Sequence, residues 1–283
     1  MGKITYTAQG PRIEGTQRLF LTTRLMWHEL LSARELIWRL FIRDFSAKYR
    51  QSVLGIGWAL LMPLVTVGMF VGMNRSGILH IEDVGVPYPL YAIIGITVWN
   101  LFSVGLTASA NSLVDAGAML VKINFPKIAL VVSASGQGIV EFLIRSVLIV
   151  LVFIYYGVTP NPFGVFIGLI CLIPLYLLTL GFGFVFSLAA GVARDIGNVL
   201  NIVFLVIMLL TPILYPITGE SILVRANVWN PFNYLVNVPR DFIVKGTSPY
   251  LAEFFMTTIG SIVIFYISWK LFYFAQTKIA ERI

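Results

Sequence analysis

The sequence predicts an all-α integral membrane protein with six transmembrane helices, an N-terminal amphipathic interfacial helix, and re-entrant helices between spans five and six. Hydrophobic residues make up 58% of the 283 residues and charged residues only 12%, where an average soluble domain carries about 25%. Four stretches contain no Asp, Glu, Lys or Arg: Gln51–Asn74, Val84–Val114, Ser146–Ala193 and Ile196–Gly219. Each reaches the roughly 20 residues that cross a hydrocarbon core, where a backbone of this length is helical.

Six spans follow from these stretches and from the last apolar segment of the chain. The run after Ser146 contains two spans, because Gly157–Pro162 combines one glycine, two prolines and an asparagine, which together signal a turn. The expected spans are Gly55–Asn74, Tyr88–Leu113, Ile128–Tyr156, Phe163–Ala193, Gly197–Tyr215 and Phe254–Phe274.

The distribution of lysine and arginine predicts the orientation. Fifteen of the twenty lie before the first span, in the loops after spans two and four, or around the end of the sixth span. The other loops hold four. Because cytoplasmic flanks are enriched in these cations, both termini are expected in the cytoplasm, with the protein in the cytoplasmic membrane. The same placement accounts for the net charge of +7 without a nucleic-acid partner.

The chain divides into three parts. Residues 1–34 form a cytoplasmic N-terminal extension for which the sequence predicts no role, residues 35–52 form the interfacial helix, and residues 53–283 form the six-helix transmembrane domain. In the interfacial helix, aromatic residues such as Phe41 occupy one arc and cations such as Arg39 the opposite arc, the pattern of a helix at the membrane surface. A soluble helix packed on a small N-terminal domain is the alternative.

The segment Pro216–Glu253 differs from the other outside loops because it is long and partly apolar. It is too polar for a full span, yet Ile222–Val224 and Tyr234–Val236 keep it apolar enough to touch the membrane. Two short re-entrant or interfacial helices broken at the prolines, including Pro239, are expected there.

Glu141 and Arg145 are the charged residues inside the third span. Charge at membrane depth is costly, so it usually pairs or faces a polar cavity, and a spacing of four residues lets the two pair with each other. A polar point on a substrate path and a self-neutralised pair facing a neighbouring helix are equally compatible with this spacing.

Aromatic and small residues recur in the spans. Gly183, Ser187 and Gly191 form a small-residue stripe, typical of close helix packing within one subunit and, as the alternative, of a dimer contact. Most aromatics fit an interfacial belt or ordinary packing. Some could stack on sugar rings in a channel, so the candidates for a translocation path are Trp58, Trp99, Phe102, Glu141, Arg145 and Tyr215.

The sequence contains no sign of chemistry of its own. It has no G-x-x-x-x-G-K-[ST] phosphate loop, which excludes ATP binding of that type. His28 and His80 are far apart, and Cys171 is the only cysteine, so no cysteine-cluster metal site or intrachain disulfide is expected. No catalytic residues, metal ligands or bound cofactors are predicted.

Several motifs follow one another in a fixed order. They are Arg43–Asp44, Lys48–Gly55, Trp58–Leu64, Asn111–Leu113, Leu120–Lys122, Phe125–Lys127, Arg194–Ile196, Thr211–Tyr215, and Asn230–Phe232 with Arg240 ten residues on. In order and spacing they resemble the membrane subunits of ABC-2-type polysaccharide exporters, the O-antigen, capsule and teichoic acid permeases. The resemblance covers about Leu36–Ala275, and the N-terminal extension departs from the shorter family pattern.

The resemblance implies a homodimer, with two separate ATPase subunits that bind ATP and Mg²⁺ on the cytoplasmic face. The residues it places at the ATPase contact are Leu120, Lys122, Phe125, Pro126, Lys127, Arg194 and Asp195. It also implies a substrate of lipid-linked glycan, whose polyprenyl diphosphate would meet the basic residues of the interfacial helix: Arg39, Arg43, Lys48 and Arg50. Contact of these arginines with anionic membrane lipid is the alternative.

Three rival functions remain at this stage. An ABC-2 exporter of lipids or drugs shares every topological feature. An ion-driven flippase or secondary transporter predicts transport without an ATPase and more membrane-embedded acids than Glu141 alone. A membrane-bound transferase would need a cluster of polar residues at one depth, which the sequence does not offer.

Overall fold

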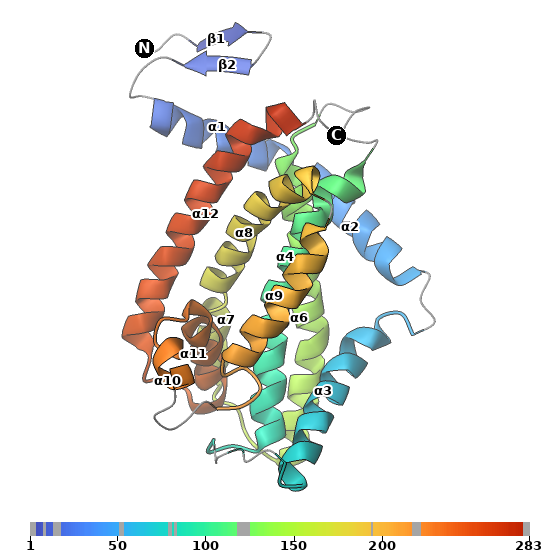
Figure 1. Cartoon of the computed structure of the whole chain (residues 1–283), viewed down its shortest axis with the longest axis vertical. Helices are drawn as coiled ribbons and strands as arrows, with labels where there is room; N and C mark the ends of the chain where they lie inside the picture. Colours follow the sequence, from blue (N-terminus) through green and yellow to red (C-terminus); the bar gives the residue numbers. More distant parts are fainter. Residues whose placement is uncertain are drawn as a thin grey trace.

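Five helices of the computed structural model are long and apolar enough to cross a membrane, within the part of the chain that is described (Figure 1). The structure describes residues 4–7, 10–13, 18–50, 54–78, 81, 84–117, 125–193, 195–216 and 222–279. The five are α3 (Gly57–Arg75), α4 (Tyr88–Ala116), α6 (Ile128–Tyr156), α7 followed by α8 (Pro162–Ile170 and Ile173–Val192), and α12 (Leu251–Ile279). A multi-pass helical membrane protein is thereby confirmed.

The predicted fifth span is a shorter apolar helix, α9 (Ile196–Leu210). Its 15 residues rise about 22 Å at 1.5 Å per residue, less than a hydrocarbon core of about 30 Å. The sequence prediction continued the helix to Tyr215. The helix ends earlier because Thr211 precedes Pro212, whose ring disfavours helical backbone before it, and Thr211 is extended at φ −103° and ψ 142°.

α4 lies at the centre of the bundle, between α6 and α8 (Figure 1). Small residues allow this close packing, since a Cβ added at Gly138 of α6 would lie 2.5 Å from the carbonyl oxygen of Leu101. A Cβ added at Gly183 of α8 would lie 2.7 Å from the Cβ of Ser109. At Gly183 the predicted small-residue stripe therefore packs against α4 of the same chain.

Two short strands and two helices precede the spans. The strands β1 (Ile4–Thr7) and β2 (Gly10–Ile13) pair as an antiparallel hairpin, a small departure from the all-helical expectation. α1 (Arg18–Ser32) and α2 (Arg34–Arg50) follow. α2 corresponds to the predicted interfacial helix, and its aromatic face meets α6, where a Cβ added at Gly136 would lie 3.0 Å from the Phe41 ring.

α1 packs on the end of α12 that lies near both termini (Figure 1). The hydroxyls of Thr23 and Tyr266 are 2.8 Å apart, and the rings of Trp27 and Trp269 meet edge to face with their centroids 5.0 Å apart. Met26 is fully buried between them and the core. The described part of the N-terminal extension thus holds the last span, a role that the sequence did not predict.

Replacing Trp27 with alanine is expected to lower the free energy of unfolding by about 1 kcal/mol, the contribution of an aromatic pair beyond its buried area. Thermal unfolding of the purified protein in detergent measures this. Leu31→Ala, on the exposed face of the same helix, is the control and should leave the midpoint unchanged. Equal midpoints for the two variants would show that the ring contact is not stabilising.

At the opposite end of the molecule, two short helices, α10 (Ile222–Asn227) and α11 (Pro231–Lys245), occupy the predicted re-entrant segment (Figure 1). Two helices were predicted here, and Pro231 begins the second one, where its missing N–H costs no hydrogen bond. The predicted break at Pro239 does not occur, because α11 continues through it. α11 packs on α7, where a Cβ added at Gly164 would lie 2.1 Å from the carbonyl oxygen of Phe242.

Candidate functional site

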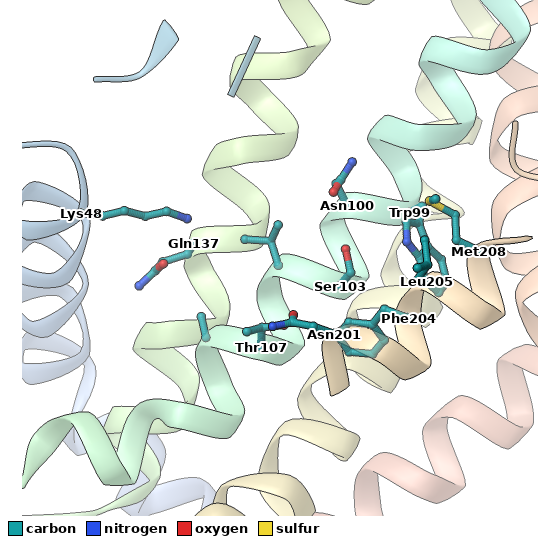
Figure 2. A pocket seen from close by; sticks show the side chains of 12 residues that line it. Lys48, Trp99, Asn100, Ser103, Thr107, Gln137, Asn201, Phe204, Leu205 and Met208 are labelled. Atoms are coloured by element: carbon teal, nitrogen blue, oxygen red, sulfur yellow. The ribbon is translucent and has the colours of Figure 1, made fainter. Parts of the chain in front are cut away.

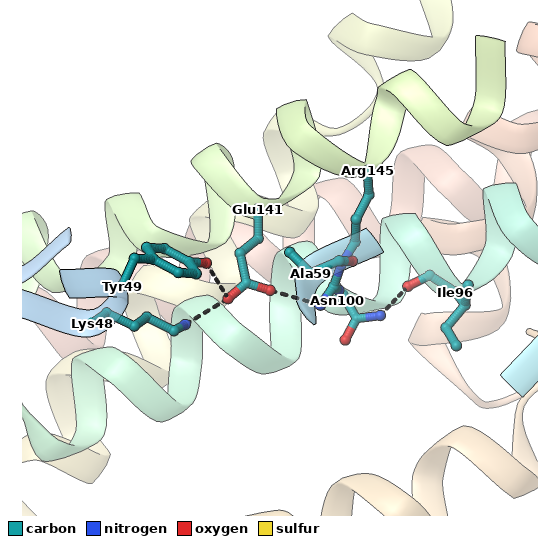
Figure 3. Close-up of polar contacts among 7 residues, drawn as sticks. All are labelled: Lys48, Tyr49, Ala59, Ile96, Asn100, Glu141 and Arg145. Carbon is teal, nitrogen blue, oxygen red and sulfur yellow. Dashed lines mark hydrogen bonds and ion pairs between the residues drawn. The ribbon is translucent and has the colours of Figure 1, made fainter. Parts of the chain in front are cut away.

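A buried polar cluster joins α2, α3 and α6 (Figure 3). The Glu141 carboxylate accepts hydrogen bonds from Nζ of Lys48 at 2.5 Å and from Nη2 of Arg145 at 2.7 Å. Tyr49 donates to the same carboxylate at 3.4 Å. Glu141 and Arg145 are only 5% and 6% exposed, so each charge relies on the other for stabilisation. Burial, together with the neighbouring carboxylate, raises the pKa of Tyr49 to about 12, so this phenol remains a hydrogen-bond donor.

Arg145 also satisfies a backbone carbonyl of α3 that has no partner within the helix. In a helix the carbonyl of Ala59 would accept the N–H of residue 63, but residue 63 is proline and has no N–H. Nε of Arg145 donates to that carbonyl at 3.1 Å instead. The cluster therefore fixes α2 and α3 to α6 through one buried carboxylate and one guanidinium.

A groove of about 450 Å³ runs beside this cluster, between α4, α6 and α9 (Figure 2). Asn100, Ser103 and Thr107 recur three and four residues apart on α4, so they share one face of that helix. Gln137 of α6 and Asn201 of α9 face the same space. The amides and hydroxyls of these side chains make the wall polar and uncharged.

The remaining residues that line the groove are apolar, apart from one cation. Figure 2 shows Trp99, Phe204 and Met208 on one side and Lys48 on the other. Lys48 is the only charged residue among the lining residues that the structure describes, and it is ion-paired with Glu141. The groove therefore suits an uncharged, hydrogen-bonding ligand with some apolar surface.

The six predicted path residues are placed differently. Trp99 lines the groove, whereas Phe102 lies behind it in an aromatic cluster, 4.7 Å from Phe232 between ring centroids. Glu141 and Arg145 form the cluster beside the groove. The last two lie elsewhere: Trp58 is exposed on α3, and Tyr215 donates to the carbonyl of Leu209 at 2.6 Å.

The predicted ATPase-contact residues that are described lie at the end near both termini. Phe125 and Pro126 precede α6, and Nζ of Lys127 donates to the carbonyl of Gln276 in α12 at 2.8 Å. Burial lowers the pKa of Lys127. Asp195 immediately precedes α9. Leu120, Lys122 and Arg194 lie outside the described residues.

The four residues of α2 that were predicted to meet the lipid diphosphate lie in three different settings. Lys48 belongs to the Glu141 cluster, and Arg39 forms an exposed pair with Glu35 on the same helix. Arg43, which pairs with Asp44, and Arg50 line a surface hollow on α2.

At the far end, a second buried arginine holds the turn that follows α9. Arg240 donates to the carbonyls of Ile213 at 3.1 Å and Pro212 at 3.3 Å, and to the side-chain oxygen of Asn237. Its guanidinium lies over the Tyr91 ring, 3.5 Å from the centroid. Gly95 permits this packing, because a Cβ there would lie 2.2 Å from the Ile213 carbonyl oxygen. The sequence marked Arg240 by its spacing from Asn230–Phe232 but not its contacts.

Known proteins are similar to this sequence over most of the chain. The O-antigen export system permease protein RfbA of Myxococcus xanthus is 24% identical over 262 residues, which cover 90% of this chain and 98% of that protein. Two Klebsiella pneumoniae proteins with the same description are 24% and 22% identical, covering 74% and 77% of this chain and 80% and 86% of their own lengths. Residues 35–244 match the ABC-2 type transporter family. The chain therefore belongs to this family and is a membrane transport component, with ATP hydrolysis carried out by a separate subunit.

Proposed function

We propose that this chain is the permease subunit of an ATP-driven exporter that moves a lipid-linked polysaccharide of O-antigen type across the cytoplasmic membrane. The observation that carries the proposal is the groove, which offers hydroxyls and amides to a sugar chain and in which the one charged residue of the described lining, Lys48, is ion-paired. Capsule or teichoic acid polymers are the other members of this substrate class. The similarity to O-antigen export permeases along nearly their whole length supports the same substrate class.

A groove of this kind disfavours the rival functions. A lipid or drug exporter would need an apolar path, whereas here the polar side chains of Ser103, Thr107 and Asn201 would face hydrocarbon. An ion-driven transporter needs a titratable group that is free to exchange its ion. Glu141 is instead held by two cations.

The topology belongs to the same proposal. α9, with the turn after it, serves as the fifth of six crossings, and α10 and α11 enter the membrane from outside without crossing it. Both termini then lie in the cytoplasm, on the side richer in lysine and arginine.

A second copy of the chain would close the groove. α9 lines it and exposes an apolar face that includes Val199, Ile202, Leu205, Val206 and Leu209, and α3 also exposes apolar side chains. A homodimer built on these faces would turn two grooves into one channel. Two ATPase subunits would contact the cytoplasmic corner at Phe125–Lys127, and the lipid diphosphate would approach the arginines of α2.

Reconstitution tests the function. The chain is co-purified with its partner ATPase subunit and placed in vesicles with the lipid-linked glycan. ATP should move the glycan across the bilayer only when both chains are present. Transport by this chain alone, without an ATPase, would contradict the proposal.

Filling the groove is expected to block export. Ser103→Phe places a ring among the polar groups of α4 and α9, so export should fall by at least tenfold while the amount of folded protein in the membrane stays near normal. Glycan on the cell surface and the purified yield measure the two quantities. Val150→Phe, on an exposed face of α6, is the matched control, and equal export by both variants would place the path elsewhere.

A further inference from the structure

A second hollow lies at the end of the molecule away from the termini, between α4, α10 and α11. Its volume is about 610 Å³, within the range of small-ligand sites. It is close to the groove along the same helix, since Tyr91 of the hollow and Trp99 of the groove are eight residues apart on α4, about 12 Å along the axis. Pro212, directly after α9, also lines it. A glycan that leaves the groove along α4 and α9 would reach this hollow next.

The wall of this hollow is fixed by a chain of hydrogen bonds along α11. Arg240 donates to Asn237, Asn237 donates to Asn233 at 2.6 Å, and Asn233 donates to the carbonyl of Asn227 at 3.3 Å. These side chains satisfy one another and are therefore held in place. The hollow is consequently a preformed surface, which lowers the entropic cost of binding a ligand.

Three groups on this wall are available to a ligand. Tyr250 is 42% exposed and rests on Tyr234, with the ring centroids 6.0 Å apart. Lys245 is exposed, and Asp241 binds only one hydrogen-bond donor among the described residues, Ser248, at 2.8 Å. Arg240, which is almost fully buried, also lines the hollow, and its Nε has no hydrogen-bond partner in the described part of the chain.

This combination has the chemistry of a sugar site. A supported tyrosine ring offers a flat apolar face to the C–H side of a pyranose, and a carboxylate and an ammonium accept from and donate to its hydroxyls. Two cations against one carboxylate leave the lining with a formal charge of +1, which disfavours cationic ligands and tolerates neutral or singly acidic sugars. An apolar lipid chain would instead desolvate these groups without pairing them.

We propose that the hollow formed by α4, α10 and α11 is an exit subsite that holds a pyranose unit of the glycan as it leaves the groove. The inference rests on the proposed function, because that function supplies a glycan at this end. Tyr250 provides the stacking face, and Asp241 and Lys245 orient the ring. A held unit would oppose backward sliding while the partner ATPase resets.

Site-specific photo-crosslinking in cells that make the glycan tests the subsite. A photoreactive amino acid replaces Lys245, and the glycan is metabolically labelled with radioactive sugar, which serves as the probe. Labelled adduct on the full-length protein is expected at position 245. Trp229 is the matched control position, because it is 88% exposed on the same end of the molecule and does not line the hollow.

Two further variants separate stacking from mere proximity. With the photoreactive group at position 245, Tyr250→Phe should keep the adduct yield, since the stacking face remains. Tyr250→Ala should reduce the yield by about fivefold, the equivalent of about 1 kcal/mol of aromatic contact. Equal yields in the two backgrounds would overturn the role of Tyr250.

A reporter at Met208, a long side chain that lines the groove, distinguishes failure of the subsite from failure of the proposed function. Glycan adduct at position 208 without adduct at 245 overturns the exit subsite and leaves the exporter function standing. No glycan adduct at either position, with export unaffected by deletion of the gene, overturns both. A protein adduct of twice the chain mass at 245 assigns the hollow to contact between two copies and also overturns the subsite.

Discussion

The variant Glu141→Gln is expected to destabilise the protein by about 3 kcal/mol, because it leaves a buried guanidinium without its counter-charge. Glutamine has nearly the same shape as glutamate, so the loss is one of charge and not of packing. Lys48 is partly exposed and can turn to water, whereas Arg145 cannot. A lower unfolding midpoint in detergent and reduced protein in the membrane would both report this loss.

The chain supplies a matched control for this variant. Glu35 and Arg39 on α2 have the same spacing of four residues and the same 2.7 Å contact, but their side chains are 74% and 75% exposed. Exposed pairs contribute little to stability, so Glu35→Gln should leave the midpoint unchanged. Equal shifts of the midpoint in Glu35→Gln and Glu141→Gln would show that burial does not determine what these ion pairs contribute.

Removing both charges distinguishes the contribution of the ion pair from that of the hydrogen bond between Arg145 and the Ala59 carbonyl. Glu141→Gln combined with Arg145→Met should recover part of the lost stability, because no unpaired charge remains buried. The carbonyl of Ala59 then lacks a donor, which costs about 1–3 kcal/mol. Adding Pro63→Ala restores the helical N–H to that carbonyl and should recover much of this second deficit. A triple variant no more stable than the double variant would show that the Ala59 contact does not stabilise the protein.

The long spans could be predicted from the sequence because lipid imposes one strong condition on each of them. Charge-free stretches of sufficient length, such as Val84–Val114, have only the helix available to satisfy the backbone. The helix α2 was predictable for a related reason, since its aromatic and cationic arcs follow the helical period. These inferences depend on local composition alone.

The buried polar cluster could not be predicted in full, because it depends on contacts between residues that are far apart in the sequence. Glu141 and Arg145 were predictable as a pair from their spacing, but Lys48 reaches them from 93 positions earlier in the chain. One local signal was present and was not used: Pro63 lies four residues after Ala59, which leaves a carbonyl that some side chain must satisfy. The spacing of Asn100, Ser103 and Thr107 is enough to indicate one polar wall of the groove. The other wall, on α9, depends on how the helices pack.

The packing of α1 on α12 was also beyond the sequence argument. Trp27 and Trp269 are separated by almost the whole chain, and neither residue alone distinguishes a tertiary contact from an aromatic at the membrane surface. The end of α9 at Leu210 is a different case, because Pro212 was visible in the sequence. The prediction carried the span on to Tyr215 on the basis of hydrophobicity, and the proline determined the end instead.

The variant Gly95→Ala is expected to destabilise the protein by about 3 kcal/mol, although alanine is the better helix former. The added Cβ would lie 2.2 Å from the carbonyl oxygen of Ile213 and 2.9 Å from Nη1 of Arg240. These two atoms form the hydrogen bond by which Arg240 holds the turn after α9, so neither can move away from the added Cβ without breaking that bond. Thermal unfolding in detergent measures the loss.

Gly68→Ala on α3 gives the opposite expectation and therefore the control. A Cβ at Gly68 meets nothing within 4 Å, so only the helix propensity changes, and stability should rise by roughly 0.5–1 kcal/mol. If Gly95→Ala also raised the midpoint, the turn would have to be able to move away from α4. The turn directly follows α9, which lines the groove, and Arg240 of α11 binds its carbonyls. If the turn is rigid, Gly95→Ala should lower export even where folded protein is recovered. If the turn can move, export should be retained.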